Sequence, residues 1–181
     1  RSWLDDYALF QAIAATMPDR SWRDWPAPLR DRDAGTLDES RRQLGREVLK
    51  QQYLQWMAET QWQGARARAA EHGVVIVGDL PFLVNAHSPD VWARPHEYLL
   101  DVSVGAPPDL YNSEGQNWGL PPMRPAALAE AGYAPFIDLL RANIGSKPQL
   151  DGFIWDAQQP TVYKWSLDLE REVIADGAST E

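Results

Sequence analysis

The strongest constraint on the fold is an unbroken run of four β-branched residues at positions 74–77, which follows a long helix-like segment and a short turn. A continuous apolar run of this kind is typical of a parallel strand that is buried on both faces. The run ends in Gly78 and Asp79, followed by a proline turn. Helix, turn, buried strand and polar loop together predict a unit of a βα-barrel, with Asp79 on the face where such barrels hold their chemistry.

The length of the chain limits how much of a barrel it can form. A second strand is predicted at 152–156, and no other segment of the 181 residues resembles a barrel strand besides 74–78. An eight-stranded barrel usually needs about 250 residues. The predicted fold is therefore α/β: an incomplete (β/α)8 TIM-barrel segment that is rich in helices.

Helices are expected on both sides of the first strand. Apolar spacing predicts one over residues 3–17, and a long one from an Asp38 cap to about Glu71. Prolines predict an extended connection over 21–29. Further along, Pro125 is expected to start a helix that Gly132 breaks, before another helix over 134–144. Most of the nine tryptophans are expected in the core, because large aromatic side chains dominate burial.

A proline-rich segment at 105–123 holds the best candidate binding residues. Its two proline pairs and three glycines predict a stiffened loop without regular helix or strand. The loop carries Asp109, Tyr111, Gln116, Asn117 and Trp118. Aromatic faces cover the C–H face of a sugar, and amides and carboxylates bond to its hydroxyls. On chemistry alone, an ordered surface loop whose tryptophan fills the adjacent core is an equally good interpretation.

Composition narrows the class of partner. A formal net charge of −9 argues against binding nucleic acid, whose phosphates need a basic surface, and favours a neutral ligand. The chain has no cysteine, no apolar stretch long enough to cross a bilayer, and no signal-peptide core at residues 1–6. Its three histidines lack metal-ligand spacing. We therefore expect a cytoplasmic protein that binds neither membrane nor metal.

The segment 105–123 resembles the donor-site loop of the amylomaltases, the 4-alpha-glucanotransferases of the α-amylase clan, which reads GAPPD and then GQNWGLPPM. The WxxWP-like segment at 22–26, the GDLP turn and the SxDVWA segment at 88–93 resemble the same family. The resemblance implies that Gln116 and Trp118 contact glucose units near the cleaved bond and that Tyr111 lies close to the glucan. Asp79 matches an acidic residue of the third barrel strand. Leu110 stands where some members have an aromatic residue.

Residues 150–157, LDGFIWDA, are similar to the fourth-strand motif of the clan, in which DGFR precedes the nucleophile by one variable residue. By this similarity Asp156 is the nucleophile. A retaining transfer needs such a carboxylate and a second carboxyl group that protonates the departing sugar. Ile154 replaces the arginine that keeps the nucleophile ionised, so Asp156 is expected to be a poorer nucleophile. A strand that merely ends in aspartate is an equal alternative.

The resemblance as a whole implies a segment of a 4-alpha-glucanotransferase that acts on maltooligosaccharides by retaining double displacement, without a cofactor. We expect no activity from the chain alone, because no convincing second carboxylate is present. Residues 1–71 would belong to an inserted helical subdomain, 72–157 would carry barrel strands and the donor-site loop, and 158–181 remain unassigned. The alternatives are a noncatalytic glucan-binding or assembly module, and a tail that is foreign to the family. Unpaired strand edges predict self-association.

Overall fold

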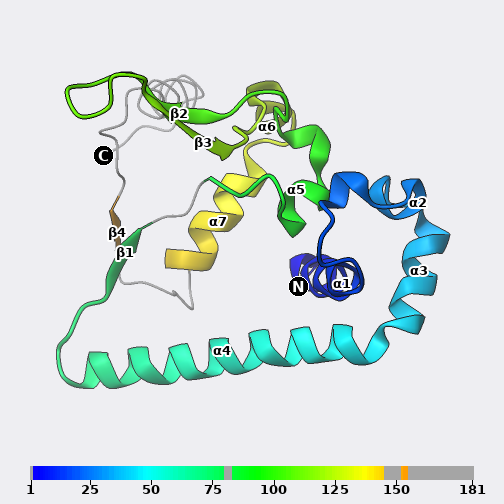
Figure 1. Cartoon of the computed structure of the whole chain (residues 1–181). Coiled ribbons are helices and arrows are strands. Elements are labelled where there is room, and N and C mark those ends of the chain that lie inside the picture. Colours follow the sequence, from blue (N-terminus) through cyan, green and yellow to red (C-terminus); the bar gives the residue numbers. More distant parts are fainter. Residues whose placement is uncertain (1, 80–82, 145–151, 155–181) are drawn as a thin grey trace.

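The computed structural model describes residues 2–79, 83–144 and 152–154, and it is built mainly of helices (Figure 1). The helices are α1 (Ser2–Thr16), α2 (Ala27–Arg30), α3 (Ala34–Gln43), α4 (Gly45–Glu71), α5 (Pro89–Ala93), α6 (Pro125–Glu130) and α7 (Ala134–Ile144). Two short 3-10 turns are η1 (Trp22–Asp24) and η2 (Pro95–Glu97). Four short strands form two separate sheets: β1 (Val77–Asp79) with β4 (Gly152–Ile154), and β2 (Val104–Ala106) with β3 (Gln116–Leu120).

The first sheet contains the two strands that the sequence predicts, in shortened form. β1 and β4 are parallel, and the register sets Val77 against Gly152 and Asp79 against Ile154. Both strands therefore end at the same edge, as expected of neighbouring βα units. The expected burial on both faces is wrong, because Val74, Val75 and Val77 are each more than half exposed. An apolar run predicts the strand, but burial depends on layers that other segments must supply.

The N-terminal helices differ from expectation in their caps. α1 matches the predicted helix closely, and α4 ends at Glu71 as expected. The predicted Asp38 cap is wrong: Asp38 lies inside α3, paired with Arg41 at 2.8 Å. The cap is Asp33, whose Oδ1 accepts hydrogen bonds from the backbone N–H of Thr36 at 2.9 Å and from its hydroxyl at 2.7 Å. A carboxylate here satisfies an N–H that has no partner within the helix.

The expected extended connection over 21–29 is also wrong, because η1 and α2 occupy most of it. Pro26 is the N-cap of α2 and Pro28 lies in its first turn. Proline fits these positions because the first turn of a helix has no internal partner for its N–H. Here the prolines start a helix and do not prevent one.

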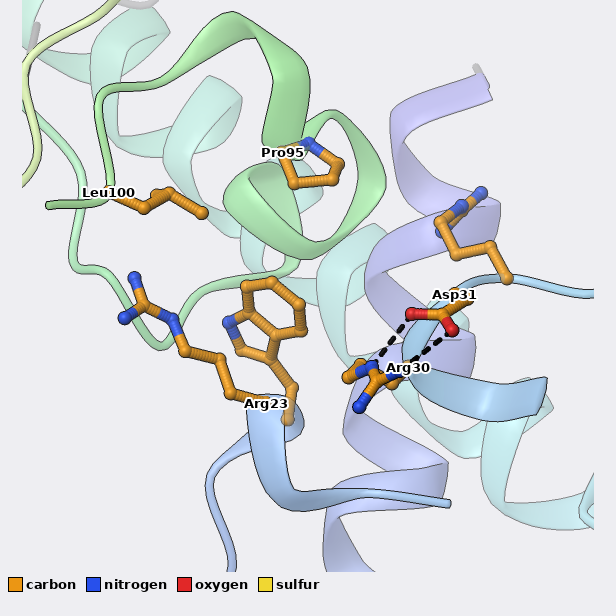
Figure 2. A pocket seen from close by; sticks show the side chains of 7 residues that line it. Arg23, Arg30, Asp31, Pro95 and Leu100 are labelled. Carbon is orange, nitrogen blue, oxygen red and sulfur yellow. Dashed lines mark hydrogen bonds and ion pairs between the residues drawn. The ribbon is translucent and has the colours of Figure 1, made fainter. Parts of the chain in front are cut away.

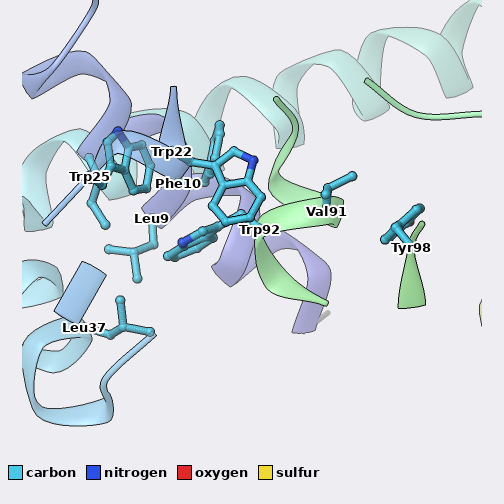
Figure 3. Close-up of a cluster of buried hydrophobic side chains, with 9 residues drawn as sticks. Leu9, Phe10, Trp22, Trp25, Leu37, Val91, Trp92 and Tyr98 are labelled. Atoms are coloured by element: carbon cyan, nitrogen blue, oxygen red, sulfur yellow. The ribbon is translucent and has the colours of Figure 1, made fainter. Parts of the chain in front are cut away.

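The hydrophobic core joins α1 to segments on both sides of the boundary expected at 71–72 (Figure 3). Its members are Leu9, Phe10, Ile13, Trp22, Trp25, Leu37, Val91, Trp92 and Tyr98. Two indoles are also fixed by hydrogen bonds, since Trp22 Nε1 donates to the Ala86 carbonyl at 2.9 Å and Trp92 Nε1 to the Leu29 carbonyl at 3.0 Å. The core thus holds residues 83–100 firmly against α1.

α4 runs beside this core, with α1 packed against it, and presents much of its own surface to solvent. Trp56 on α4 is 60% exposed and stacks on Tyr53, with ring centroids 5.6 Å apart. Of the helices in the described ranges, none combines the length and apolar character needed to span a bilayer.

Candidate functional site

The segment 104–120 folds as an antiparallel hairpin, so the expectation of a loop without regular structure is wrong (Figure 1). In the register of β2 and β3, Gly105 faces Asn117 and Val104 faces Leu120. Both proline pairs, at 107–108 and 121–122, lie just outside the strands. Proline interrupts a strand only where its missing N–H belongs to the ladder, so the residues between the pairs are free to form one.

Glycines make the close pairing of this hairpin sterically allowed. A Cβ on Gly105 would lie 1.9 Å from the Gln116 carbonyl oxygen, and one on Gly115 would lie 2.7 Å from the Ala106 carbonyl oxygen. Gly115 also has a φ of 74°, a conformation that glycine adopts without strain. These glycines therefore permit backbone approach, which is a role different from breaking structure.

A bulge separates the two paired ends of the hairpin. The register shifts after Val104, which leaves Trp118 and Gly119 of β3 without opposite residues. Gly119 has a φ of 68°, and its N–H donates to Asn117 Oδ1 at 2.9 Å. Bulges redirect side chains and are common beside functional sites. The Asn117 oxygen, which the sequence suggested for sugar hydroxyls, here supports the bulge.

The tip of the hairpin is ordered by Asp109. Its Oδ1 accepts hydrogen bonds from the backbone N–H groups of Tyr111 at 2.8 Å and Asn112 at 2.7 Å. The side chains of Leu110 and Tyr111 are 100% and 99% exposed. An Asx-type turn thus fixes the backbone while its apolar side chains contact nothing in the described chain. Tyr111 is displayed as the loop prediction requires, whereas Asp109 is engaged with the backbone through one oxygen.

Gln116 and Trp118 lie two residues apart on β3 and are hydrogen-bonded to each other, with Trp118 Nε1 donating to Gln116 Oε1 at 3.0 Å. An indole N–H is only a donor, so the amide oxygen must be the atom that faces it. The two N–H groups of the Gln116 amide are consequently turned away from the indole. Gln116 is exposed and Trp118 is half-buried. Together they offer an aromatic surface beside an oriented hydrogen-bond donor.

Asn112 is a residue that the sequence argument did not single out, although it organises the same tip. Its carbonyl accepts hydrogen bonds from the N–H groups of Asp109 at 2.9 Å and Gly115 at 3.2 Å. Its side-chain Oδ1 accepts from the Glu114 N–H at 3.3 Å. The spacing of Asp109 and Asn112 around an exposed pair of residues is a turn signal that could have identified it.

The remaining predicted residues belong to the first sheet or lie outside the described residues. Asp79 is the last residue of β1, opposite Ile154 of β4. Asp156 lies outside the described residues. The structure therefore brings Asp109, Tyr111, Gln116 and Trp118 onto one hairpin, and places the Asp79 backbone in the other sheet.

A cavity of about 420 Å³ beside η1 is basic but does not form a comparable site. Figure 2 shows Arg23 beside Leu100 and apart from the Arg30–Asp31 pair. Arg30 binds Asp31 through two hydrogen bonds of 2.7 and 2.8 Å, which lower the pKa of Asp31 and raise that of Arg30. Its cationic groups do not converge on one point. Within the described ranges, no group of three or more acidic or histidine side chains is arranged to hold a metal ion.

A family model described as 4-alpha-glucanotransferase matches residues 1–147. The chain belongs to the 4-alpha-glucanotransferase family. The predicted family is thereby confirmed over most of the chain, including the whole hairpin. The match ends before β4 and does not reach the fourth-strand motif.

Individual relatives agree with the family model. The 4-alpha-glucanotransferase of Thermus thermophilus is 38% identical over 141 residues, which cover 75% of this chain and 28% of the relative. That of Chlamydia pneumoniae is 39% identical over 166 residues, which cover 87% of this chain and 31% of the relative. This 4-alpha-glucanotransferase family member thus spans less than a third of the length of these curated relatives.

A solved structure gives the fold of the family. Amylomaltase from Streptococcus agalactiae in complex with acarbose matches with a TM-score of 0.77 at 24% identity. The match covers 84% of this chain and 32% of the amylomaltase chain. The family member described here therefore has the fold of one part of an amylomaltase.

Proposed function

We propose that this chain is the donor-site segment of a 4-alpha-glucanotransferase, and that its β2–β3 hairpin binds α-1,4-glucan. It would contribute an incomplete (β/α)8 barrel with a helical subdomain to a cytoplasmic enzyme. Family membership supports the reaction class. The parallel β1–β4 pair supports the barrel, because adjacent parallel strands with a helical crossover are its repeating unit.

The Trp118–Gln116 hydrogen bond is the observation that carries this proposal. A glucan presents alternating C–H faces and hydroxyl groups. The indole ring would cover a C–H face, and the oriented Gln116 N–H groups would donate to a hydroxyl or ring oxygen beside it. Because the protein itself holds the amide, less side-chain entropy is lost on binding. Tyr111 would extend the aromatic surface from the hairpin tip.

The chemistry of the whole enzyme would be a retaining double displacement. Asp156 would attack the anomeric carbon as the glycosidic bond breaks, and the glycosyl ester would then pass to the 4-hydroxyl of another sugar. Asp79 and Asp156 follow strands that end at one edge of the sheet, which supports their assignment to one active face. A second carboxyl group is needed to protonate the leaving oxygen. We expect no transfer between maltotriose molecules by this chain alone.

Isothermal titration with maltotriose tests the binding proposal. Trp118→Ala should weaken binding by more than about tenfold, because it removes both the ring and the amide's anchor. Trp118→Phe keeps a ring but loses the N–H, and should weaken binding by roughly twofold to tenfold. Gln116→Glu can still accept from the indole but cannot donate, so it separates orientation from donation. Trp56→Ala, which removes an exposed tryptophan of α4, is the matched control. Unchanged affinity in Trp118→Ala would remove the hairpin from the site.

Ile154 favours a second candidate, a noncatalytic glucan-binding module that has kept the hairpin. An α-glucosyl fluoride separates the two. Fluoride departs without protonation, so attack by Asp156 on the anomeric carbon would release fluoride and leave a glucosyl ester even without the second carboxyl group. Mass spectrometry would detect one added glucosyl unit, absent from Asp156→Asn. Maltotriose binding without any adduct would favour the noncatalytic module.

Strand edges support a further part of the proposal, self-association. Within the described residues β1 pairs with one strand only, and its flanking valines Val74 and Val75 are exposed. Open edges with apolar flanks tend to pair with other chains. Light scattering coupled to size exclusion should give a mass above that of one chain. Val75→Lys should return the mass to that of a monomer, and a monomeric parent chain would contradict the proposal.

A further inference from the structure

A second cleft lies between α1, α5 and α7, away from the hairpin in sequence. It encloses about 380 Å³, within the range of roughly 300–1,000 Å³ that is usual for small-molecule sites. None of the residues that line it belongs to segment 104–120. The residues that carry chemistry are Trp3, Asp6 and Tyr7 from α1, Asp90 and Arg94 from α5 and its C-cap, and Asp138 from α7.

One wall of this cleft is aromatic. Trp3 and Tyr7 lie one helical turn apart on α1, with ring centroids 6.2 Å apart and planes at 66°. Trp3 is 50% exposed, although it stands beside a well-packed helix. No hydrogen bond joins the indole N–H or the phenol to another residue in the described part of the chain. Both rings therefore offer apolar surface together with a free polar tip.

The acidic groups of the cleft are already neutralised by arginines. The pairs are Asp6–Arg32 at 2.7 Å, Asp90–Arg94 at 3.5 Å and Asp138–Arg141 at 3.5 Å. A carboxylate in such a pair keeps lone pairs that accept hydroxyl hydrogen bonds, while the pair adds no net charge. This balance argues against a cationic ligand, which would need unpaired carboxylates. It suits a ligand that carries many hydroxyl groups and no charge.

We infer that the cleft between α1, α5 and α7 is a second carbohydrate site, which binds a neutral oligosaccharide independently of the hairpin. The Trp3 ring covers a C–H face of the sugar. The Trp3 N–H and Tyr7 O–H donate to its oxygens, and the paired carboxylates accept from its hydroxyls. An aromatic wall with convergent donors and acceptors is the chemistry that such ligands require.

Nuclear magnetic resonance of the isotopically labelled chain, titrated with maltotriose, tests this site directly. The Trp3 indole signal and the Asp138 backbone amide should shift together and saturate. Trp3→Ala should weaken the response of Asp138 by roughly fivefold or more. Tyr7→Phe removes one hydroxyl without changing the packing and should weaken it by roughly twofold to fivefold. Trp56→Ala should leave it unchanged.

Two further arms separate this inference from the proposed function. In Trp118→Ala the cleft signals should still respond to maltotriose even though hairpin binding is lost. The inference is overturned if neither Trp3 nor Asp138 shifts, or if Trp118→Ala abolishes their response. It is also overturned if choline, a cation that aromatic walls bind, shifts these signals at lower concentration than maltotriose.

Discussion

The tryptophan core and the β2–β3 hairpin use the same aromatic residue types in opposite ways. In the core, Trp92 is fully buried, its N–H is bonded to the Leu29 carbonyl, and Arg32 lies 4.3 Å from its ring centroid (Figure 3). In the hairpin, Tyr111 is almost fully exposed, and the Trp118 N–H is bonded to an exposed side chain. The protein itself satisfies the core aromatics, whereas it positions the hairpin aromatics and leaves their faces open.

The difference shows what separates a packing aromatic from a binding one. Both regions fix their backbone by the same device, a carboxylate that accepts backbone N–H groups: Asp33 at the start of α3 and Asp109 at the hairpin tip. Beyond the Asp33 cap, α3 contributes Leu37 to the core. Beyond Asp109, Leu110 and Tyr111 meet no described residue. Order without coverage marks the hairpin as a surface held ready for a ligand.

Removing a core aromatic should have the largest effect. Trp92→Ala deletes a fully buried ring and leaves both the Leu29 carbonyl and Arg32 without their partner. We expect a loss of about 3–5 kcal/mol in the free energy of unfolding, measured by urea denaturation. Trp56→Ala, at an exposed position, should change it by less than about 0.5 kcal/mol. Equal effects of the two substitutions would break the comparison.

A methyl group at Gly105 should damage the hairpin selectively. The added Cβ would meet the Gln116 carbonyl at 1.9 Å, so the strands must separate. We expect a local cost of about 1–3 kcal/mol and loss of the Trp118 indole signal from its hydrogen-bonded position in nuclear magnetic resonance. Gly64→Ala is the opposite control: nothing lies near its Cβ, and alanine should stabilise α4 by roughly 0.5–1 kcal/mol. A normal indole signal in Gly105→Ala would show that the pairing is looser than described.

Titration of Tyr98 should report the integrity of the core. Burial raises the pKa of Tyr98 to about 12, with smaller contributions from Arg94, Asp90 and Glu97. A raised pKa means that the stabilising contribution is complete below the unfolded value of about 10 and is lost as pH rises through about 12. Phenolate absorbance should show a late step that is missing in Tyr98→Phe. If both proteins give the same curve, Tyr98 is not buried in solution.

The smallest effect should come from the Asp33 cap at low pH. Hydrogen bonds from Thr36 lower the pKa of Asp33 below its usual range. A lowered pKa means that the contribution is present above the unfolded value and is lost as pH falls through the folded value, below about pH 4. Asp33→Asn keeps an oxygen for the cap, so this part of the acid sensitivity should disappear while stability near neutral pH is retained. Helicity followed by circular dichroism across this range tests it, and unchanged acid sensitivity would contradict it.

Much of the fold was predictable because its signals are local. α1, the end of α4, α6 and α7 follow from apolar spacing and from the breakers Pro18, Pro125 and Gly132. The errors share one cause: a proline or glycine was read without its place in an element. Pro28 begins α2, and Gly105 permits a strand pair, because each residue's effect depends on whether its N–H or its missing Cβ faces a partner.

The candidate site divides in the same way. Residue types and their order determined the family, and singled out Tyr111, Gln116 and Trp118 as sugar-compatible side chains. Only the tertiary structure decided how they are used: the hairpin register and its bulge bring the Trp118 N–H to the Gln116 oxygen, and an Asx turn displays Tyr111. It also decided that Trp92 is buried whereas Trp3 lines an open cleft. Sequence specifies which groups are present, but hydrogen-bond direction and burial depend on neighbours that the folded chain brings from distant positions.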